Sequence, residues 1–404
     1  IPVQDLSASV GEARVKTTCP YCGVGCGVTL IRQREQDMPV GDQEHPANSG
    51  RMCVKGSALH ETIGLNGRLL YPEVDGKQTD WESALGRVSD KLQETINKYG
   101  PDAVAFYVSG QLLTQDYYVA NKLMKGYIGS ANIDTNSRLC MSTAVAAHKR
   151  VFGADAVPTS YEDLELADLI VLYGSNMAWT HPVVYQRIAA AKAARPELKI
   201  VVIDPRRTST AELADLHLPI KPGSDIQLID GLLVHLINKG HEDSAFIQAH
   251  TESYENIREN IRQRSADKSV IAEQCDISLE QLERFYQWFA STETTVSVFS
   301  QGINQSSRGV DQASLILYSH LVTGRIGQEG SGPFSITGQP NAMGGREVGG
   351  LANQLAAHMN IESAEHRATV QTFWGSPTIC ETAGAKAVDM FRRIEDGTIK
   401  FVWI

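Results

Sequence analysis

The chain has 404 residues, of which 42% are hydrophobic and 21% charged, and its formal net charge is -10. This length predicts two or three domains, and the composition is that of an ordinary globular protein. Because nucleic acids and anionic membrane surfaces attract positively charged proteins, the negative charge disfavours both as partners. We therefore expect no nucleic acid and no membrane among the partners.

Four cysteines near the start of the chain have the spacing of metal ligands. Two residues separate Cys19 from Cys22, three separate Cys22 from Cys26, and 26 separate Cys26 from Cys53. Four soft thiolates suit an iron–sulfur cluster, and the glycines between them let the backbone bend closely around a bulky centre. Structural zinc is the main alternative, but it usually takes two CxxC pairs, and Cys53 stands alone. A radical enzyme that uses adenosylmethionine is a third possibility, but its triad usually has the wider gap first. We predict a cluster.

Cysteine usage also bears on the compartment. The chain has seven cysteines, an odd number, and four of them are grouped, which favours metal ligands in a reducing compartment over a disulfide framework. The segment Ile1–Asp5 has neither the apolar core of a signal peptide nor a twin-arginine pair. We expect the cytoplasm.

Beyond Cys53, short β-rich runs alternate with longer amphipathic stretches, which indicates an α/β fold. The predicted strands are 103–108, 169–173, 200–203 and 295–300. The predicted helices, whose apolar residues recur every three to four positions, are 83–98, 115–128, 183–194, 225–238, 279–290 and 312–323. Residues 390–404 predict a helix end, a turn at Asp396-Gly397 and a strand that stops abruptly, so we expect the protein to continue.

Turns after two of these strands have the chemistry of a nucleotide site. Gly174–Asn176 follows the strand 169–173, and Asp204–Arg207 follows the strand 200–203. Ligands collect at the carboxyl ends of the strands in an open α/β sheet, where a carboxylate suits a ribose or a guanine and a guanidinium suits a phosphate. Taken alone, both turns also match ordinary helix-start chemistry.

Two later turns extend this pattern. Lys221–Asp225 is ambiguous in the same way, because Asp225 is also a good N-cap for the helix that follows. Gly338–Glu347 surrounds Arg346 with glycines. So many glycines imply that the backbone approaches something large and polar.

In order along the chain, these segments resemble the molybdenum oxidoreductases that carry bis(molybdopterin guanine dinucleotide). The resemblance covers the loop 19–26, the turn 51–56, and the segments 174–176, 203–207 and 338–340. Within this family, the segments Asn136–Thr143 and Gln339–Gly349 are most similar to the bacterial assimilatory nitrate reductases.

The resemblance implies the fold and its division into domains. Residues 1–60 would form a small iron–sulfur domain with a 4Fe-4S cluster. Residues 61–135 would begin a Rossmann-like parallel-sheet domain that resumes at about 347–404, and residues 136–346 would form a second such domain that binds a pterin guanine dinucleotide. The terminal β-rich domain of the family would be absent from this chain.

The resemblance also implies roles for individual residues. Cys140 would ligate molybdenum, Met141 and Arg346 would line the nitrate pocket, and Lys55 would lie between the cluster and a pterin. A lone cysteine without such context is more often a small buried apolar residue, which is what we expect of Cys275 and Cys380. The implied cofactor-binding residues are Lys55, Gly174, Ser175, Asn176, Asp204, Pro205, Arg206, Asp225, Gln301, Gly302, Gln339, Met343 and Gly344.

The implied activity is reduction of nitrate to nitrite by oxygen-atom transfer at molybdenum, in nitrate assimilation. Electrons would come through the cluster from a ferredoxin, a flavodoxin or an NADH-dependent reductase. Formate dehydrogenases of the family are an alternative, but a histidine usually follows their metal ligand, where this chain has Met141. His148 and His181 are more simply interpreted as a helix residue and a turn partner.

Two further alternatives lie outside molybdenum catalysis. A non-catalytic electron-carrying iron–sulfur subunit of the same fold would lack the metal, and the presence of Cys140, Met141 and Arg346 argues against it. A zinc-stabilised nucleotide-binding protein would have no redox role.

Overall fold

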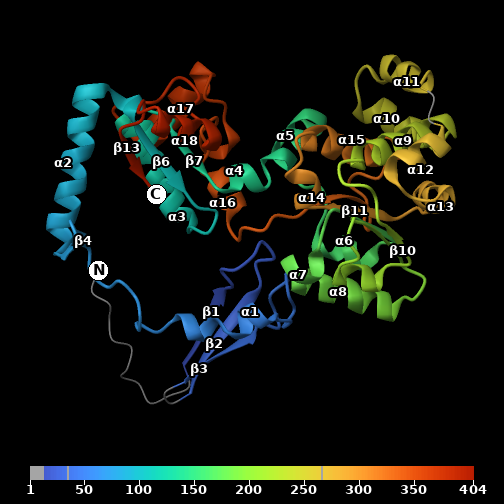
Figure 1. The fold of residues 1–404 in the computed structure, drawn as a ribbon, viewed down its shortest axis with the longest axis horizontal. Coiled ribbons are helices and arrows are strands. Elements are labelled where there is room, and N and C mark those ends of the chain that lie inside the picture. Colours follow the sequence, from blue (N-terminus) through green and yellow to red (C-terminus); the bar gives the residue numbers. More distant parts are fainter. Residues whose placement is uncertain (1–12, 34–35, 265–266) are drawn as a thin grey trace.

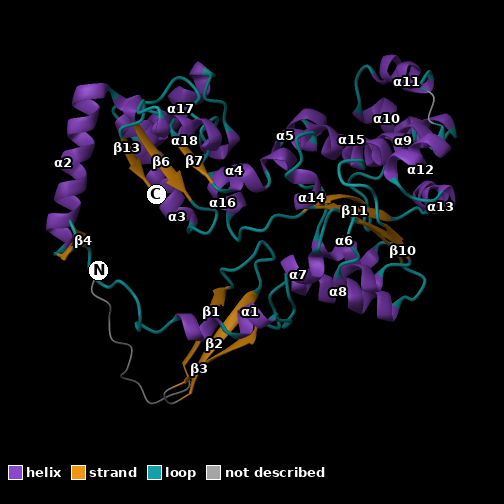
Figure 2. Cartoon of the chain, viewed as in Figure 1, coloured by secondary structure: helices purple, strands orange, loops and turns teal. Residues whose placement is uncertain are grey.

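The computed structural model describes residues 13–33, 36–264 and 267–404 (Figure 1). Residues 1–12, which hold the segment Ile1–Asp5 and the start of the predicted iron–sulfur domain, lie outside the described residues. The described parts combine helices with parallel and antiparallel sheets, as Figure 2 shows. The predicted α/β fold class is confirmed.

The first part is a small antiparallel sheet that carries the cysteine loop. Its order is β1-β2-β3, formed by β1 (Ala13–Thr18), β2 (Gly27–Gln33) and β3 (Gln36–Gly41). The loop Cys19–Cys26 joins β1 to β2 and is closed by a hydrogen bond from the Cys19 amide to the Cys26 carbonyl, 2.8 Å long. Cys53 directly precedes α1 (Val54–Ser57), and the 3-10 helix η1 (Leu59–Thr62) follows. The sequence analysis did not predict these strands.

The second part is a five-stranded parallel sheet in the order β10-β9-β8-β11-β12. Its strands are β8 (Leu169–Tyr173), β9 (Lys199–Ile203), β10 (Leu216–Leu218), β11 (Thr295–Phe299) and β12 (Gly332–Ser335). Tyr173 lies opposite both Ile203 and Phe299, so β8, β9 and β11 end at one edge of the sheet. The strand order reverses at β8, and such switch points form ligand crevices in open α/β sheets.

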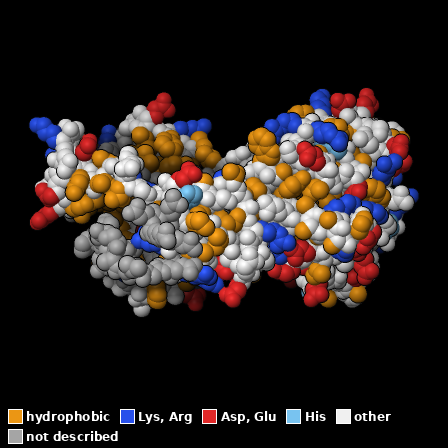
Figure 3. Space-filling model, turned by 90° about the horizontal axis from the view of Figure 1, so that it is seen from below, with side chains coloured by type: hydrophobic (Ala, Val, Ile, Leu, Met, Phe, Trp, Pro, Cys, Tyr) orange, Lys and Arg blue, Asp and Glu red, His pale blue; other side chains and the backbone are white. Residues whose placement is uncertain are grey.

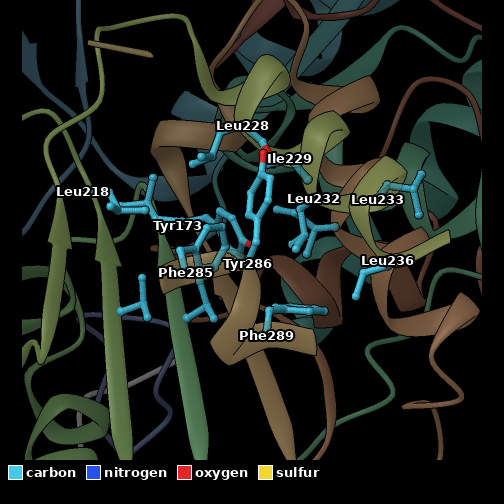
Figure 4. Packing of buried hydrophobic residues seen from close by; sticks show 14 of the residues in the cluster. Tyr173, Leu218, Leu228, Ile229, Leu232, Leu233, Leu236, Phe285, Tyr286 and Phe289 are labelled. Atoms are coloured by element: carbon cyan, nitrogen blue, oxygen red, sulfur yellow. The ribbon is translucent and has the colours of Figure 1, made fainter. Parts of the chain in front are cut away.

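Helices cover both faces of this sheet. One face packs on the helices α5, α9, α12, α13 and α15, with Tyr173, Phe285, Tyr286 and Phe289 at the centre of the core (Figure 4). The other face packs on α6 and α8, and its core extends to the cysteine loop through Val24 and Val28. Because both faces are covered, β8 and β9 are nearly continuous apolar runs, and short runs of this kind indicate buried strands in a sequence.

The helices of this part, in chain order, are α5 (Ser142–Phe152), α6 (Tyr161–Leu166), α7 (Met177–Thr180), α8 (Pro182–Ala194), η4 (Ser209–Leu213), α9 (Asp225–Asn238), α10 (Ser244–His250), α11 (Tyr254–Arg262), α12 (Lys268–Cys275), α13 (Leu279–Ser291), α14 (Gln301–Asn304) and α15 (Gly309–Val322). The predicted helix 225–238 is confirmed at both ends, whereas α15 begins three residues before the predicted start.

The third part is a smaller parallel sheet in the order β13-β6-β7. It pairs β6 (Val104–Val108) and β7 (Ile133–Thr135) with β13 (Phe401–Trp403), which follows α18 (Ala387–Glu395), so the predicted helix, turn and strand at the end of the chain are confirmed. The remaining elements are β4 (Glu73–Val74), β5 (Lys77–Gln78), α2 (Trp81–Tyr99), η2 (Pro101–Ala103), α3 (Thr114–Lys122), η3 (Leu123–Ile128), α4 (Ser137–Cys140), α16 (Ala342–Glu347), η5 (Ala356–His358) and α17 (Ala364–Trp374). The domain bounds inferred from the sequence stay predictions.

One predicted helix needs correction. The segment 115–128 is not a single α-helix, because α3 ends at Lys122 and η3 continues as a π-helix. Single π-turns of this kind often occur at functional sites.

Two surface properties complete the description. Among the described residues, no helix has both the length and the apolar character needed to span a membrane. Acidic and basic side chains are interspersed over the face shown in Figure 3.

Candidate functional site

The four cysteines near the amino end lie within electrostatic range of one another. Cys19, Cys22 and Cys26 are each less than a tenth exposed, and burial raises the pKa of Cys26 to about 12, with Cys22, Cys19 and Cys53 adding to the rise. Buried thiols become thiolates when a positive centre binds them. No three possible ligand side chains in the described ranges are close enough to hold a single ion, and the set of four soft sulfurs suits a larger iron–sulfur centre.

The cysteine loop is docked on the segment that follows β12. The Gly23 amide donates to the Gly338 carbonyl over 3.1 Å, and a Cβ on Gly23 would collide with the Thr337 carbonyl. The Tyr161 hydroxyl also donates to the Val24 carbonyl over 3.1 Å. Glycine at position 23 therefore allows the loop to lie directly against Thr337.

Lys55 lies on α1 and acts electrostatically on both the cysteine loop and His181. Burial raises the pKa of Cys19 and of Cys22, and the Lys55 ammonium partly offsets the rise in both. Burial lowers the pKa of His181, the Thr337 carbonyl raises it, and Lys55 lowers it further. Lys55 is thus within electrostatic range of both groups.

His181 is fully buried and links two segments. Its Nε2 is 2.6 Å from the Thr337 carbonyl oxygen, and its Nδ1 is 2.8 Å from the Thr180 hydroxyl. The sequence analysis interpreted His181 only as a helix residue or turn partner. Its link to Thr337 joins residues 156 positions apart, so local pattern offers no signal for it.

Cys140 ends the short helix α4 and is 9% exposed. Gln301 Nε2 donates to its sulfur over 2.8 Å, and the Thr337 hydroxyl lies 3.9 Å from the same sulfur. Thr337 therefore contacts both the cysteine loop and the neighbourhood of Cys140. A thiol in this position can ligate a soft, redox-active metal.

Met141 and Arg346 lie together beside a small cavity. Arg346 Nη1 is 3.2 Å from the Met141 sulfur, and Tyr117, Ser137 and Leu351 also line the cavity. Burial lowers the pKa of Arg346, and the nearby Asp155 carboxylate raises it. A buried guanidinium at a cavity wall can bind a planar oxyanion through two parallel hydrogen bonds.

The support behind Arg346 was not found from the sequence. Asp155 Oδ2 lies 3.3 Å from Arg346 Nε, within ion-pair distance but without hydrogen-bond geometry. The same carboxylate oxygen is 3.7 Å from His358 Nδ1, and His358 Nε2 is 3.2 Å from Glu347. These residues converge only through the fold.

A second cavity, of about 390 Å³, opens at the carboxyl ends of β8, β9 and β11. Asp204 and Asp225 both line it, and burial followed by the charge of Asp204 raises the pKa of Asp225. Asp225 is the first residue of α9, and Ser224, not Asp225, is the N-cap. The predicted cofactor-binding residues that line this cavity are Gly174, Asn176, Asp204, Pro205, Arg206, Asp225, Gln301 and Gly302.

The other predicted residues lie elsewhere. Ser175 is buried, and its hydroxyl has no hydrogen-bond partner. Gln339 Oε1 accepts from the Thr337 hydroxyl over 3.2 Å. Met343 is 56% exposed on α16, and the adjoining Gly344 packs against Asn341 and Thr114. None of these four lines the second cavity, and their roles stay predictions.

Comparison with known proteins gives a consistent result. Residues 12–64 match the Fe4S4 domain of molybdopterin oxidoreductases, and residues 68–404 match the molybdopterin oxidoreductase family itself. A nitrate reductase from Klebsiella oxytoca is 52% identical over 96% of this chain and 44% of its own length, and one from Shewanella frigidimarina is 48% identical over 96% and 42%. This chain therefore spans less than half the length of these two relatives.

A solved structure supports the fold alone. The acetylene hydratase from Pelobacter acetylenicus superposes with a TM-score of 0.69 at 20% identity, over 78% of this chain and 43% of its own. The thiol set and the cavity at the sheet edge suit the cofactors of the matched domains, a 4Fe-4S cluster and a molybdenum-bound molybdopterin. With its Fe4S4 domain and its parallel-sheet core, the chain belongs to the molybdopterin oxidoreductase family.

Proposed function

We propose that this protein reduces nitrate to nitrite by oxygen-atom transfer at a molybdenum centre held by Cys140. The observation that carries the proposal is the buried Arg346 guanidinium, which contacts the side chain that follows Cys140 and lines a cavity there. A cation in a dry cavity beside a metal-ligating thiol suits a small anionic substrate. The names of the two nitrate reductases are consistent with this substrate.

A molybdenum centre held by Cys140 would supply the oxygen-atom transfer, and the overall reaction would consume nitrate, two electrons and two protons and yield nitrite and water. The protein's part is to bind and orient the anion. Arg346 would hold two nitrate oxygens, while Asp155 fixes the guanidinium from behind and balances its charge when the cavity is empty. Met141 supplies a soft apolar wall.

Cys19, Cys22, Cys26 and Cys53 would hold a cluster, which would supply one-electron transfer. Lys55, within electrostatic range of Cys19 and of His181, would support electron transfer toward the pterin. We propose a ferredoxin, a flavodoxin or an NADH-dependent reductase as donor, and a role in nitrate assimilation in the cytoplasm.

The cavity at the sheet edge would hold a guanine dinucleotide. Asp204 and Asp225 offer acceptors for the N–H groups of a guanine or for ribose hydroxyls, and Arg206 offers a donor to phosphate. Gly174 and Gly302 both line the cavity, and their backbones lie in direct contact. A side chain would not fit between them, because a Cβ on Gly174 would lie 2.6 Å from Gly302 Cα.

The proposal is tested with protein prepared anaerobically from cells that make the pterin. We expect molybdenum and iron in the protein, and consumption of nitrate but not oxidation of formate with viologen dyes as redox partners. Cys140→Ser is expected to abolish nitrate reduction while the cluster signal remains. Cys275→Ser, which changes a buried cysteine outside the site, is the matched control. Protein that lacks molybdenum, or full turnover in Cys140→Ser, would exclude the proposal.

A further inference from the structure

Gln301 connects the nucleotide cavity to Cys140. It follows Ser300, the residue after β11 and the N-cap of α14, and is the first residue of α14, where it lines the cavity at the sheet edge. Its side-chain Nε2 also lies 2.8 Å from the Cys140 sulfur. Two residues 161 positions apart are thus joined by a side-chain contact.

The backbone that carries Gln301 is tightly placed. The Gly302 amide donates to the Gly174 carbonyl over 3.0 Å, and a Cβ on Gly302 would lie 2.5 Å from Gly174 Cα. This close approach ties the start of α14 to the end of β8. The Gln301 side chain therefore extends from a fixed point on the sheet.

The orientation of the Gln301 amide is set from both ends. The Ser300 hydroxyl donates to Gln301 Oε1, which leaves the NH2 group facing Cys140. A thiolate sulfur has only lone pairs to offer, so the opposite orientation would place two acceptors against each other. The Thr337 hydroxyl, 3.9 Å from the sulfur, is a second and weaker neighbour.

We propose that Gln301 tunes the molybdenum centre by donating a hydrogen bond to the Cys140 thiolate. This inference rests on the proposed role of Cys140 as the metal ligand. A hydrogen bond to a metal-bound sulfur withdraws electron density from it, so the sulfur donates less to the metal and the reduction potential rises. A neutral amide provides this bond without transferring its proton to the sulfur.

Gln301→Met is the direct test, because methionine has a similar length and no N–H donor. Gln305→Met is the matched control, since Gln305 is exposed and donates to the Leu139 carbonyl and not to the Cys140 sulfur. Molybdenum and iron contents and the midpoint potentials of molybdenum, followed by its Mo(V) magnetic resonance signal, are measured in the loaded protein. We expect a shift to lower potential in Gln301→Met and the wild-type value in Gln305→Met. A wild-type potential in Gln301→Met overturns the proposal.

A second measurement uses the wild-type protein and does not depend on the variant's folding. Protein labelled with 15N at glutamine side chains is expected to show a 15N coupling to the Mo(V) signal, and Gln305→Met is expected to keep it. Absence of this coupling in the wild-type protein overturns the role of Gln301. A Mo(V) signal unchanged by Cys140→Ser would instead refute the metal-ligand role of Cys140, and this inference with it, so the two failures are distinguishable.

Discussion

Lys125 provides the sharpest test of how the fold holds the cavity beside Arg346. The side chain is fully buried in η3, and its ammonium donates to the carbonyls of Gly349, Leu351 and Gln354 over 2.6, 2.8 and 2.6 Å. Leu351 lines the cavity beside Arg346, and Gln354 Nε2 donates to the Arg346 carbonyl over 2.8 Å. One ammonium therefore organises the segment that supports the arginine.

We predict that Lys125→Met lowers the free energy of unfolding by about 2–4 kcal/mol. All three carbonyls lose the ammonium as a donor. The Leu351 carbonyl keeps the Gln354 amide as a donor at 3.4 Å, so the carbonyls of Gly349 and Gln354 are the two that are left without one. Each buried acceptor without a partner costs roughly 1–3 kcal/mol, which gives a sum of about 2–6 kcal/mol. We expect the lower half of this range of free energies, because the substitution also removes a charge whose burial is itself unfavourable. Burial lowers the pKa of Lys125 to about 8, which reflects this cost.

The assay for Lys125→Met is urea denaturation, with the nitrate KM of the loaded protein measured in parallel. We expect a lower midpoint at an unchanged m-value and a raised KM, because the cavity wall loses its support. Lys122→Met, on the same stretch of helix but only partly buried, is the control. Equal stability and equal KM in Lys125→Met and Lys122→Met would refute this account of Lys125.

Three further predictions concern the site and the core. Arg346→Lys is expected to raise the nitrate KM about tenfold or more, because a two-pronged donor becomes a point charge, and an unchanged KM would remove Arg346 from the pocket. Lys55→Met is expected to slow reduction of molybdenum through the cluster in stopped-flow measurements while leaving the nitrate KM unchanged, and equal rates would make Lys55 structural. His320 is fully buried, and burial, with a smaller contribution from Arg325, holds its pKa well below 6.5. The unfolded chain alone takes up this proton below about pH 6.5, so stability falls by about 1.4 kcal/mol per pH unit there, and His320→Leu should reduce that slope in denaturation curves at pH 5–7.

The sequence predicted best where burial acts on a continuous segment. Strands β8, β9 and β11 and helix α9 were located because most of their residues are buried and apolar, although Thr295 and Ser297 of β11 are buried polar residues. Strands β1 to β3 escaped prediction because they are largely exposed or half-buried and lack an apolar face to mark them. The π-helix η3 was not predicted, because its apolar residues continue the helical spacing of the apolar residues in α3.

The residues of the candidate site also fall into two groups, those that local sequence patterns indicated and those that they did not. Cysteine spacing and strand-end turns are local patterns, and they pointed to the cysteine loop and to most of the lining of the sheet-edge cavity. Asp155, His358 and Lys125 act through partners far away in the sequence, such as Asp155 on Arg346 and Lys125 on Gly349. No local pattern encodes a contact of that range, so only the folded chain shows these residues.

Thr337 shows how such long-range contacts link the two proposed metal sites. Its carbonyl accepts from His181 and faces Gly23 of the cysteine loop, while its hydroxyl lies 3.9 Å from the Cys140 sulfur. One residue thus fixes the cysteine loop and Cys140 relative to each other through direct contact. Electron transfer depends steeply on separation, so a rigid spacer suits its purpose better than a flexible linker. The absence of a side chain at Gly23 permits this spacing, because a Cβ there would push the loop away from Thr337.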